Sequence, residues 1–262
     1  VVGGLASQFG ALLPFGQAAA TLADAACIQL SPSTVRVVSE AVGARREAEL
    51  RQLVADAWQD GLPVVAAPAP ERLYVAMDGV RIMSTSGEGR EAKVGVVVPE
   101  RRGPDGQPHR DAASYVTSFA TAATFGPRLA LEAHRRGLEE AVEVVVLGDG
   151  AEWIWNLAAE HCPQATQIVD WYHASERIWE LGRALYGDAS RPGTAWVERQ
   201  LALLAAGQVR RLVRNWRRRV CTGAAATVRD EQVTYFTNQA GRMAYDQYRA
   251  GGLDIGSGMV ES

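Results

Sequence analysis

Two aspartates, each followed by a glycine, are the residues of this chain whose surroundings best suit chemistry. Asp78 ends the apolar run in residues 73–80 (LYVAMDGV), and Asp149 ends the one in residues 142–150 (VEVVVLGDG). Apolar, β-rich runs of this length are typical of buried strands, so we expect each carboxylate at the end of a strand. A third acid, Glu261, follows GSGMV near the end of the sequence. Carboxylates are preferred ligands of hard divalent cations, so the three acids predict a shared metal site.

The chemistry that such a site favours is phosphoryl transfer on nucleic acid, which commonly uses two divalent ions about 3.5–4 Å apart. We therefore expect Asp78, Asp149 and Glu261 to bind two Mg²⁺ (or Mn²⁺) ions. An isolated Asp-Gly pair is more often a plain turn. The interpretation depends on both aspartates following apolar strands that fit one strand order.

A polar cluster, DWYH, follows a further short apolar run at residues 166–169. Asp170 is suited to cap a helix that begins there. His173 lies three residues later on the same helical face, where it could bond near the metals or to a phosphate. A purely structural histidine is the alternative.

Six arginines and no acid occur within ten residues, in VRRLVRNWRRR at 209–219. Helical spacing puts positions 210, 214, 217 and 218 on one face and lets Leu212, Val213, Trp216 and Val220 partly face a core. Planar, always charged guanidinium groups bind phosphate well, so we predict DNA contacts here, with a solvated helix face as the alternative. The predicted DNA-binding residues are Arg210, Arg211, Arg214, Arg217 and Arg218.

Composition limits the remaining possibilities. The chain has 262 residues, is 47% hydrophobic and carries a net charge of -3, so no global positive field indicates nucleic acid. Its three cysteines lack CxxC spacing, which fits a reducing cytoplasm. No apolar run approaches the roughly 20 residues of a membrane span, and no signal peptide is visible. Without an initiating Met, and ending just after Glu261, the sequence is interpreted as a fragment.

The first 62 residues are predicted to be helical. Residues 14–26 and 34–42, with Ser31 or Ser33 as the cap, have the layout of a helix-turn-helix DNA reader or of an ordinary helical hairpin. Residues 44–59 read as a third, solvated connecting helix. Three prolines in residues 62–71 mark a domain boundary.

Beyond that boundary the order of expected elements is characteristic. Three strands (73–80, 81–85, 92–99) precede a polar loop (101–109), a helix (111–137, with a break at Gly126-Pro127), a strand (142–147), a helix (150–161) and a strand (166–169). Helices follow at 174–186, 194–204, 209–220 and 225–250, with a weak strand signal at 233–236. This order predicts an α/β fold with a ribonuclease-H-like mixed sheet and an all-helical insertion. The expected domains are 1–62 (helical, DNA-binding-like), 63–174 (catalytic core), 175–250 (insertion) and 251–262 (third catalytic segment).

Five motifs, in order, resemble a known family. They are MDGV (77–80), GDGAEWIW (148–155), DWYH (170–173), FTNQAGRMAY (236–245) and GSGMVES (256–262). Together they resemble bacterial insertion-sequence DDE transposases of the ISKra type, which are related to the Mutator-like superfamily.

The resemblance implies that Asp78, Asp149 and Glu261 form the catalytic triad, and that Asp170 and His173 match an Asp-x-x-His element. It also implies transposon-end and target DNA as partners, a homo-oligomer on that DNA, and a location in the bacterial cytoplasm with the nucleoid. The alternatives are a ribonuclease-H-like nuclease and an inactive DNA-binding transposase fragment. A metabolic α/β enzyme is disfavoured because the chain has no phosphate-cradling GxGxxG or GxxxxGK[ST] motif.

Overall fold

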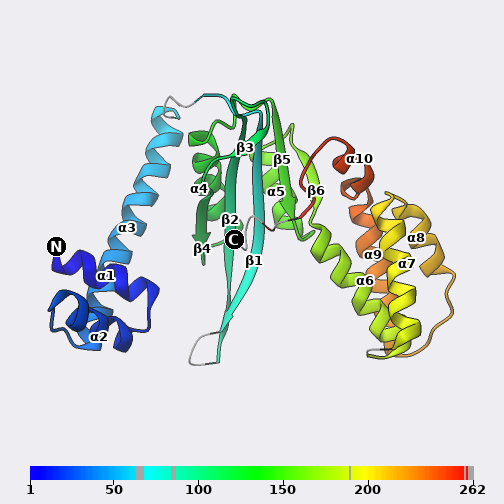
Figure 1. Ribbon diagram of the computed structural model, residues 1–262, viewed down its shortest axis with the longest axis horizontal. Helices are drawn as coiled ribbons and strands as arrows, with labels where there is room; N and C mark the ends of the chain where they lie inside the picture. The colour runs from blue at the N-terminus through cyan, green and yellow to red at the C-terminus, as the bar shows by residue number, and fades with distance from the viewer. Residues whose placement is uncertain (63–67, 84–86, 189, 257, 259–262) are drawn as a thin grey trace. The chain divides into compact units, whose positions relative to one another are not determined.

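The computed structural model describes residues 1–62, 68–83, 87–188, 190–256 and 258 (Figure 1). The chain divides into two compact units, Val1–Pro63 and Val64–Ser262. The division falls within residues 62–71, where the sequence has three prolines. Each unit has its own hydrophobic core.

The first unit consists of α1 (Val2–Leu12), α2 (Phe15–Ala26) and α3 (Pro32–Asp60). Ser31 caps α3, because the backbone N–H of Thr34 donates to its Oγ at 3.1 Å. These helices meet around a small core. Its buried residues are Ala6, Ala18, Ala19, Leu22 and Val35.

The expected separation into helices 34–42 and 44–59 is wrong, because α3 is continuous through Gly43. A glycine inside a helix costs only about 1 kcal/mol relative to alanine. Ion pairs such as Arg45–Glu49 and Arg51–Glu47, four residues apart, favour helix on its C-terminal side. Whether α2 and α3 form a DNA reader stays a prediction.

The second unit is built on a six-stranded mixed sheet of order β3-β2-β1-β5-β6, with β4 also pairing with β2. β1 pairs antiparallel with β2 and parallel with β5, and β5 pairs parallel with β6. β3 and β4 are both antiparallel to β2. The strands are β1 (Arg72–Met83), β2 (Gly89–Arg102), β3 (Pro108–Arg110), β4 (Ser114–Ser118), β5 (Glu143–Gly148) and β6 (Thr166–Val169).

Two strand expectations are corrected. Residues 73–80 and 81–83 form one strand, because Gly79 remains extended and pairs with Lys93 instead of turning; residues 84–85 of the second expected strand lie outside the described residues. The expected loop 101–109 is likewise shorter, since its first residues continue β2 and its last two open β3.

The expected helix 111–137 is also corrected. It begins only at Ala122 and forms α4 (Ala122–Arg135), which continues through Gly126-Pro127 without the expected break. Before it, the β-favouring residues Tyr115, Val116 and Thr117 pair with β2 in strand β4.

One face of the sheet is covered by α4 and α5 (Glu152–His161). Val75 and Met77 of β1 line a small apolar pocket together with Leu129 of α4 and Leu157 of α5. Side chains alternate along a strand, so Tyr74, Ala76 and Asp78 point to the other face. That face carries the candidate site.

The remaining helices are α6 (Trp171–Tyr186), α7 (Arg191–Ala205), α8 (Val209–Arg217), α9 (Ala224–Gln239), the short 3₁₀ helix η1 (Ala240–Arg242) and α10 (Tyr245–Ala250). Trp216 of α8 packs against α7 and α9, with ring centroids 5.0 Å from Phe236 and 6.3 Å from Trp196. The single helix expected over 225–250 is interrupted after α9, and the weak strand signal at 233–236 lies within α9. In the part of the chain that the structure describes, none of the helices is both long and apolar enough to cross a bilayer.

Candidate metal site and basic groove

The first two predicted metal ligands follow directly after paired residues of two neighbouring parallel strands. Met77 of β1 is opposite Gly148 of β5, and each is followed directly by an aspartate. Paired residues of parallel strands point to the same face of a sheet. Asp78 and Asp149 therefore follow a paired position at the same end of two neighbouring strands.

Both aspartates are partly exposed and hold local hydrogen bonds. The N–H of Ala151 donates to Asp149 Oδ1 at 2.7 Å, and the N–H of Gly79 donates to Asp78 Oδ1 at 2.7 Å. The expectation that Asp78 ends its strand is wrong, because β1 continues to Met83. The parallel pairing with β5 ends at Met77, and beyond Gly79 the sheet narrows to β1 and β2, the long ribbon visible in Figure 1.

Glu261, the third predicted ligand, lies outside the described residues. Among the residues that are described, no three His, Cys, Asp or Glu side chains gather as ligands for a metal ion. The two aspartates fit a divalent cation in ligand type, since both offer partly exposed carboxylate oxygens at one sheet edge. Two of the three predicted ligands thus follow directly after paired residues of β1 and β5.

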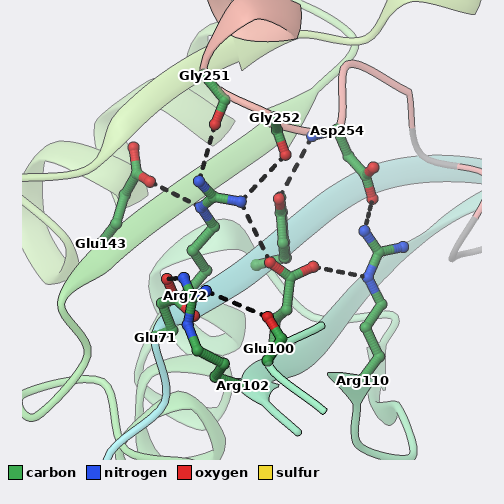
Figure 2. A network of polar contacts seen from close by, with 11 residues as sticks. Glu71, Arg72, Glu100, Arg102, Arg110, Glu143, Gly251, Gly252 and Asp254 are labelled. Atoms are coloured by element: carbon green, nitrogen blue, oxygen red, sulfur yellow. Dashed lines mark hydrogen bonds and ion pairs between the residues drawn. The ribbon is translucent and has the colours of Figure 1, made fainter. Parts of the chain in front are cut away.

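The segment leading toward Glu261 is fastened to the sheet by the polar network in Figure 2. Arg72 of β1 donates to the carbonyl oxygens of Gly251 and Gly252 at 2.8 and 3.1 Å. The Asp254 carboxylate lies 2.6 Å from Arg110, and the backbone N–H of Asp254 donates to the Tyr74 hydroxyl at 3.3 Å. Residues 251–254 are therefore held against the face of β1 that also carries Asp78.

The same segment then reaches the first turn of α6. The N–H of Trp171 donates to the carbonyl of Ile255 at 2.8 Å. Asp170, just before α6, is fully buried and accepts from the N–H groups of Tyr172 and His173 at 2.7 and 3.1 Å. The expected helix cap is confirmed, and it accounts for one carboxylate oxygen of Asp170.

His173 and Asp149 line a common cleft of about 580 Å³. Among the residues the structure describes, Asp78 is not part of this lining. The His173 imidazole is 3.7 Å from the Glu176 carboxylate. The remaining lining residues come from α6 and are Glu176, Arg177, Trp179, Glu180 and Arg183.

Two side chains of α9 contact the backbone that carries Asp149, and sequence patterns did not reveal them. Tyr235 donates its hydroxyl to the Asp149 carbonyl at 2.7 Å, and Gln239 donates to the Gly150 carbonyl at 2.9 Å. The Arg177 guanidinium stacks 3.9 Å from the Tyr235 ring. Burial raises the pKa of Tyr235 to about 12, so its hydroxyl stays protonated and able to donate near neutral pH.

The arginine-rich helix α8 forms a groove with α9. Arg210, Arg214, Arg217 and Arg218 line a hollow of about 670 Å³, together with Val213, Phe236, Thr237, Ala240 and Gly241. These are the four arginines that helical spacing placed on one face. Arg211 is directed elsewhere, since it donates to the Gln208 side chain at 3.0 Å.

The apolar side of α8 is largely as expected. Leu212, Val213 and Trp216 are buried, but Val220 is 93% exposed. The expectation for Val220 is wrong because α8 ends at Arg217. The basic groove thus rests on an apolar support and presents its charges outward.

Comparison with known proteins found no family model and no curated protein sequence that matches the chain.

Proposed function

We propose that this protein is a DNA transposase that cleaves and joins strands at insertion-sequence ends in a metal-dependent reaction. The observation that carries the proposal is the β1–β5 register, which pairs Met77 with Gly148, the residues directly before Asp78 and Asp149. Two carboxylates at the same end of neighbouring strands are suited to hold divalent cations on a phosphate substrate.

The strand order supports a ribonuclease-H-like core within the mixed α/β fold. β1, β2 and the strands beyond β2 pair antiparallel, while β5 and β6 extend the other side of β1 in parallel. A meander of strands followed by two strand–helix units is the arrangement expected from the sequence. In this arrangement the first strand and the first parallel strand are neighbours, as the two aspartates require.

The proposed ligands of two Mg²⁺ or Mn²⁺ ions are Asp78, Asp149 and Glu261. Bound ions would activate the attacking oxygen and stabilise the leaving oxygen of the phosphodiester. Asp78 and Asp149 offer their carboxylates at the same end of β1 and β5. His173 lines the cleft that Asp149 also lines, where a hydrogen bond to the DNA is available. The proposed site of DNA binding is the groove of Arg210, Arg214, Arg217 and Arg218.

The test is strand cleavage of a labelled duplex that carries the DNA flanking the gene, in Mg²⁺ or Mn²⁺. Asp78→Asn and Asp149→Asn should each abolish cleavage while duplex binding persists. Asp188→Asn, at an exposed position after α6, is the matched control and should cleave normally. Full cleavage by Asp149→Asn would refute the assignment.

Capture of the cleaved end by a target plasmid separates the candidate activities. A joined product is expected from a transposase, whereas a nuclease of the same fold would cut without joining. Binding of the duplex with neither cleavage nor joining would favour the inactive DNA-binding alternative.

A further inference from the structure

Helix α9 lies between the basic groove and the loop that carries Asp149. Thr237 lines the groove, and Arg217 of α8 donates to its hydroxyl at 3.2 Å. Tyr235 and Gln239, one helical turn apart, contact the Asp149–Gly150 backbone instead. Residues four apart share a helix face, so α9 directs one face to the loop and another to the groove.

Tyr235 packs its ring against the loop that carries Asp149, in addition to its hydrogen bond there. Gly150 has φ +102°, a backbone conformation that side chains rarely adopt. A Cβ added there would lie 2.7 Å from the Tyr235 ring. The ring therefore packs directly on the backbone of Gly150 while its hydroxyl holds the preceding carbonyl.

These contacts bear on the carboxylate itself. The Asp149 side chain accepts from the N–H of Ala151, so the short turn 149–151 determines where the carboxylate points. Tyr235 and Gln239 hold the two carbonyl groups within that turn. Removing a group that orients a metal-binding residue through hydrogen bonds commonly weakens the affinity for the metal.

We propose that Tyr235 and Gln239 are positioning residues, which hold the Asp149–Gly150 backbone so that the Asp149 carboxylate faces the same site as Asp78. The inference rests on the proposed function for its metal, but the positioning itself is a property of the metal-free protein. It assigns the helical insertion a role in the geometry of the site, in addition to DNA contact.

The experiment compares Tyr235→Phe and Gln239→Leu with the unaltered chain. Tyr235→Phe removes one hydroxyl and keeps the ring that packs on Gly150. The matched control is Tyr248→Phe, which removes a hydroxyl 3.4 Å from the carbonyl of Gln167 in β6, away from Asp149. Amide hydrogen exchange in metal-free protein is the first measurement, Mn²⁺ binding by electron paramagnetic resonance the second, and cleavage rate the third.

In Tyr235→Phe the Ala151 amide should exchange roughly fivefold faster, the ratio expected for one lost hydrogen bond. The amide of Val146, within β5, should be unchanged, and Tyr248→Phe should leave both amides as they were. Mn²⁺ affinity and cleavage rate should fall roughly tenfold in Tyr235→Phe and in Gln239→Leu.

Three results overturn a claim, and they differ from one another. Unchanged exchange at Ala151 refutes the positioning role whatever the metal does. Faster exchange with unchanged Mn²⁺ affinity and cleavage refutes its relevance to the site. Faster exchange in a protein whose unaltered form neither binds Mn²⁺ nor cleaves DNA upholds the contact and refutes the proposed function.

Discussion

Arg110 Nη2 lies 2.6 Å from Asp254 Oδ2, and this ion pair joins strand β3 to the segment that follows α10. The same guanidinium donates to Glu100 at 3.2 Å, and the side chain of Glu100 is only 6% exposed. One arginine thus links the return segment to a carboxylate inside the sheet. Networks of this kind contribute more than isolated surface pairs.

Replacing Arg110 by leucine should lower the free energy of unfolding by about 1 kcal/mol, because Glu100 and Asp254 both lose a charged partner. The expected loss of unfolding free energy is small because the Arg110 side chain is 42% exposed. Urea titration measures it. Arg102→Leu, whose ion pair with Glu71 is on the surface, should have a smaller effect. Equal losses in the two variants would count against the network.

The basic groove should control the salt dependence of DNA binding. Each phosphate contact contributes about 0.9 to the slope of log affinity against log salt. We expect Arg214→Gln with Arg217→Gln to reduce the slope by one to two such units, as measured by fluorescence anisotropy between low and moderate salt. Arg211→Gln, outside the groove, and Arg199→Gln, exposed on α7, serve as controls. Equal reductions in the controls would refute a localised groove.

Gly150→Ala should destabilise the protein by roughly 1–3 kcal/mol, the range expected for strained backbone at such a position. It suffers both the positive φ and the close approach of the Tyr235 ring. Gly187→Ala provides the matched control, since Gly187 has φ +80° and open space where its Cβ would go. Thermal melting measures both variants, and the extra destabilisation of Gly150→Ala over Gly187→Ala reports the clash with the Tyr235 ring. If the two variants melt alike, the ring does not confine Gly150.

Stability should fall on mild acidification because of His161. Burial lowers the pKa of this imidazole, so the unfolded chain takes up a proton at higher pH than the folded protein does. The stability that the neutral imidazole contributes is fully present above the unfolded-state pKa of about 6.5, and it is lost as the pH falls toward the folded-state pKa. In His161→Gln the midpoint of urea unfolding should change less between pH 7.5 and 5.5 than it does in the unaltered protein. Exposed His109→Gln should retain the unaltered profile; a loss of pH dependence there would contradict the assignment.

Local patterns were sufficient for much of the fold. Residues 166–169 form a strand with the expected bounds, and the helix expected over 14–26 forms from Phe15 to Ala26, because their apolar or alanine-rich composition agrees with their surroundings. Asp78-Gly79 misled the prediction, because this dipeptide favours turns and only pairing with Val94 and Lys93 keeps it extended. Strand β4 was missed for a related reason, since its pairing with β2 outweighs the helical reading.

The candidate site was predictable only in part. Local composition was enough to predict Asp78, Asp149 and the arginines as candidates. How the two aspartates lie relative to each other depends on the β1–β5 register. Tyr235 could not be found, because its partner Asp149 is far away in the sequence and no periodic pattern links the two. Contacts of this kind are set by the tertiary fold alone.

The bonds from Arg72 to Gly251 and Gly252 also bear on the order of events during synthesis. Arg72 opens the first strand of the second unit, and its acceptors are not made until the helical insertion is complete. Native contacts between such distant positions slow folding, because a long stretch of chain must be enclosed before they form. The sheet therefore acquires these bonds only after residues 251 and 252 have emerged from the ribosome, so this unit cannot complete its fold before the helical insertion has been made.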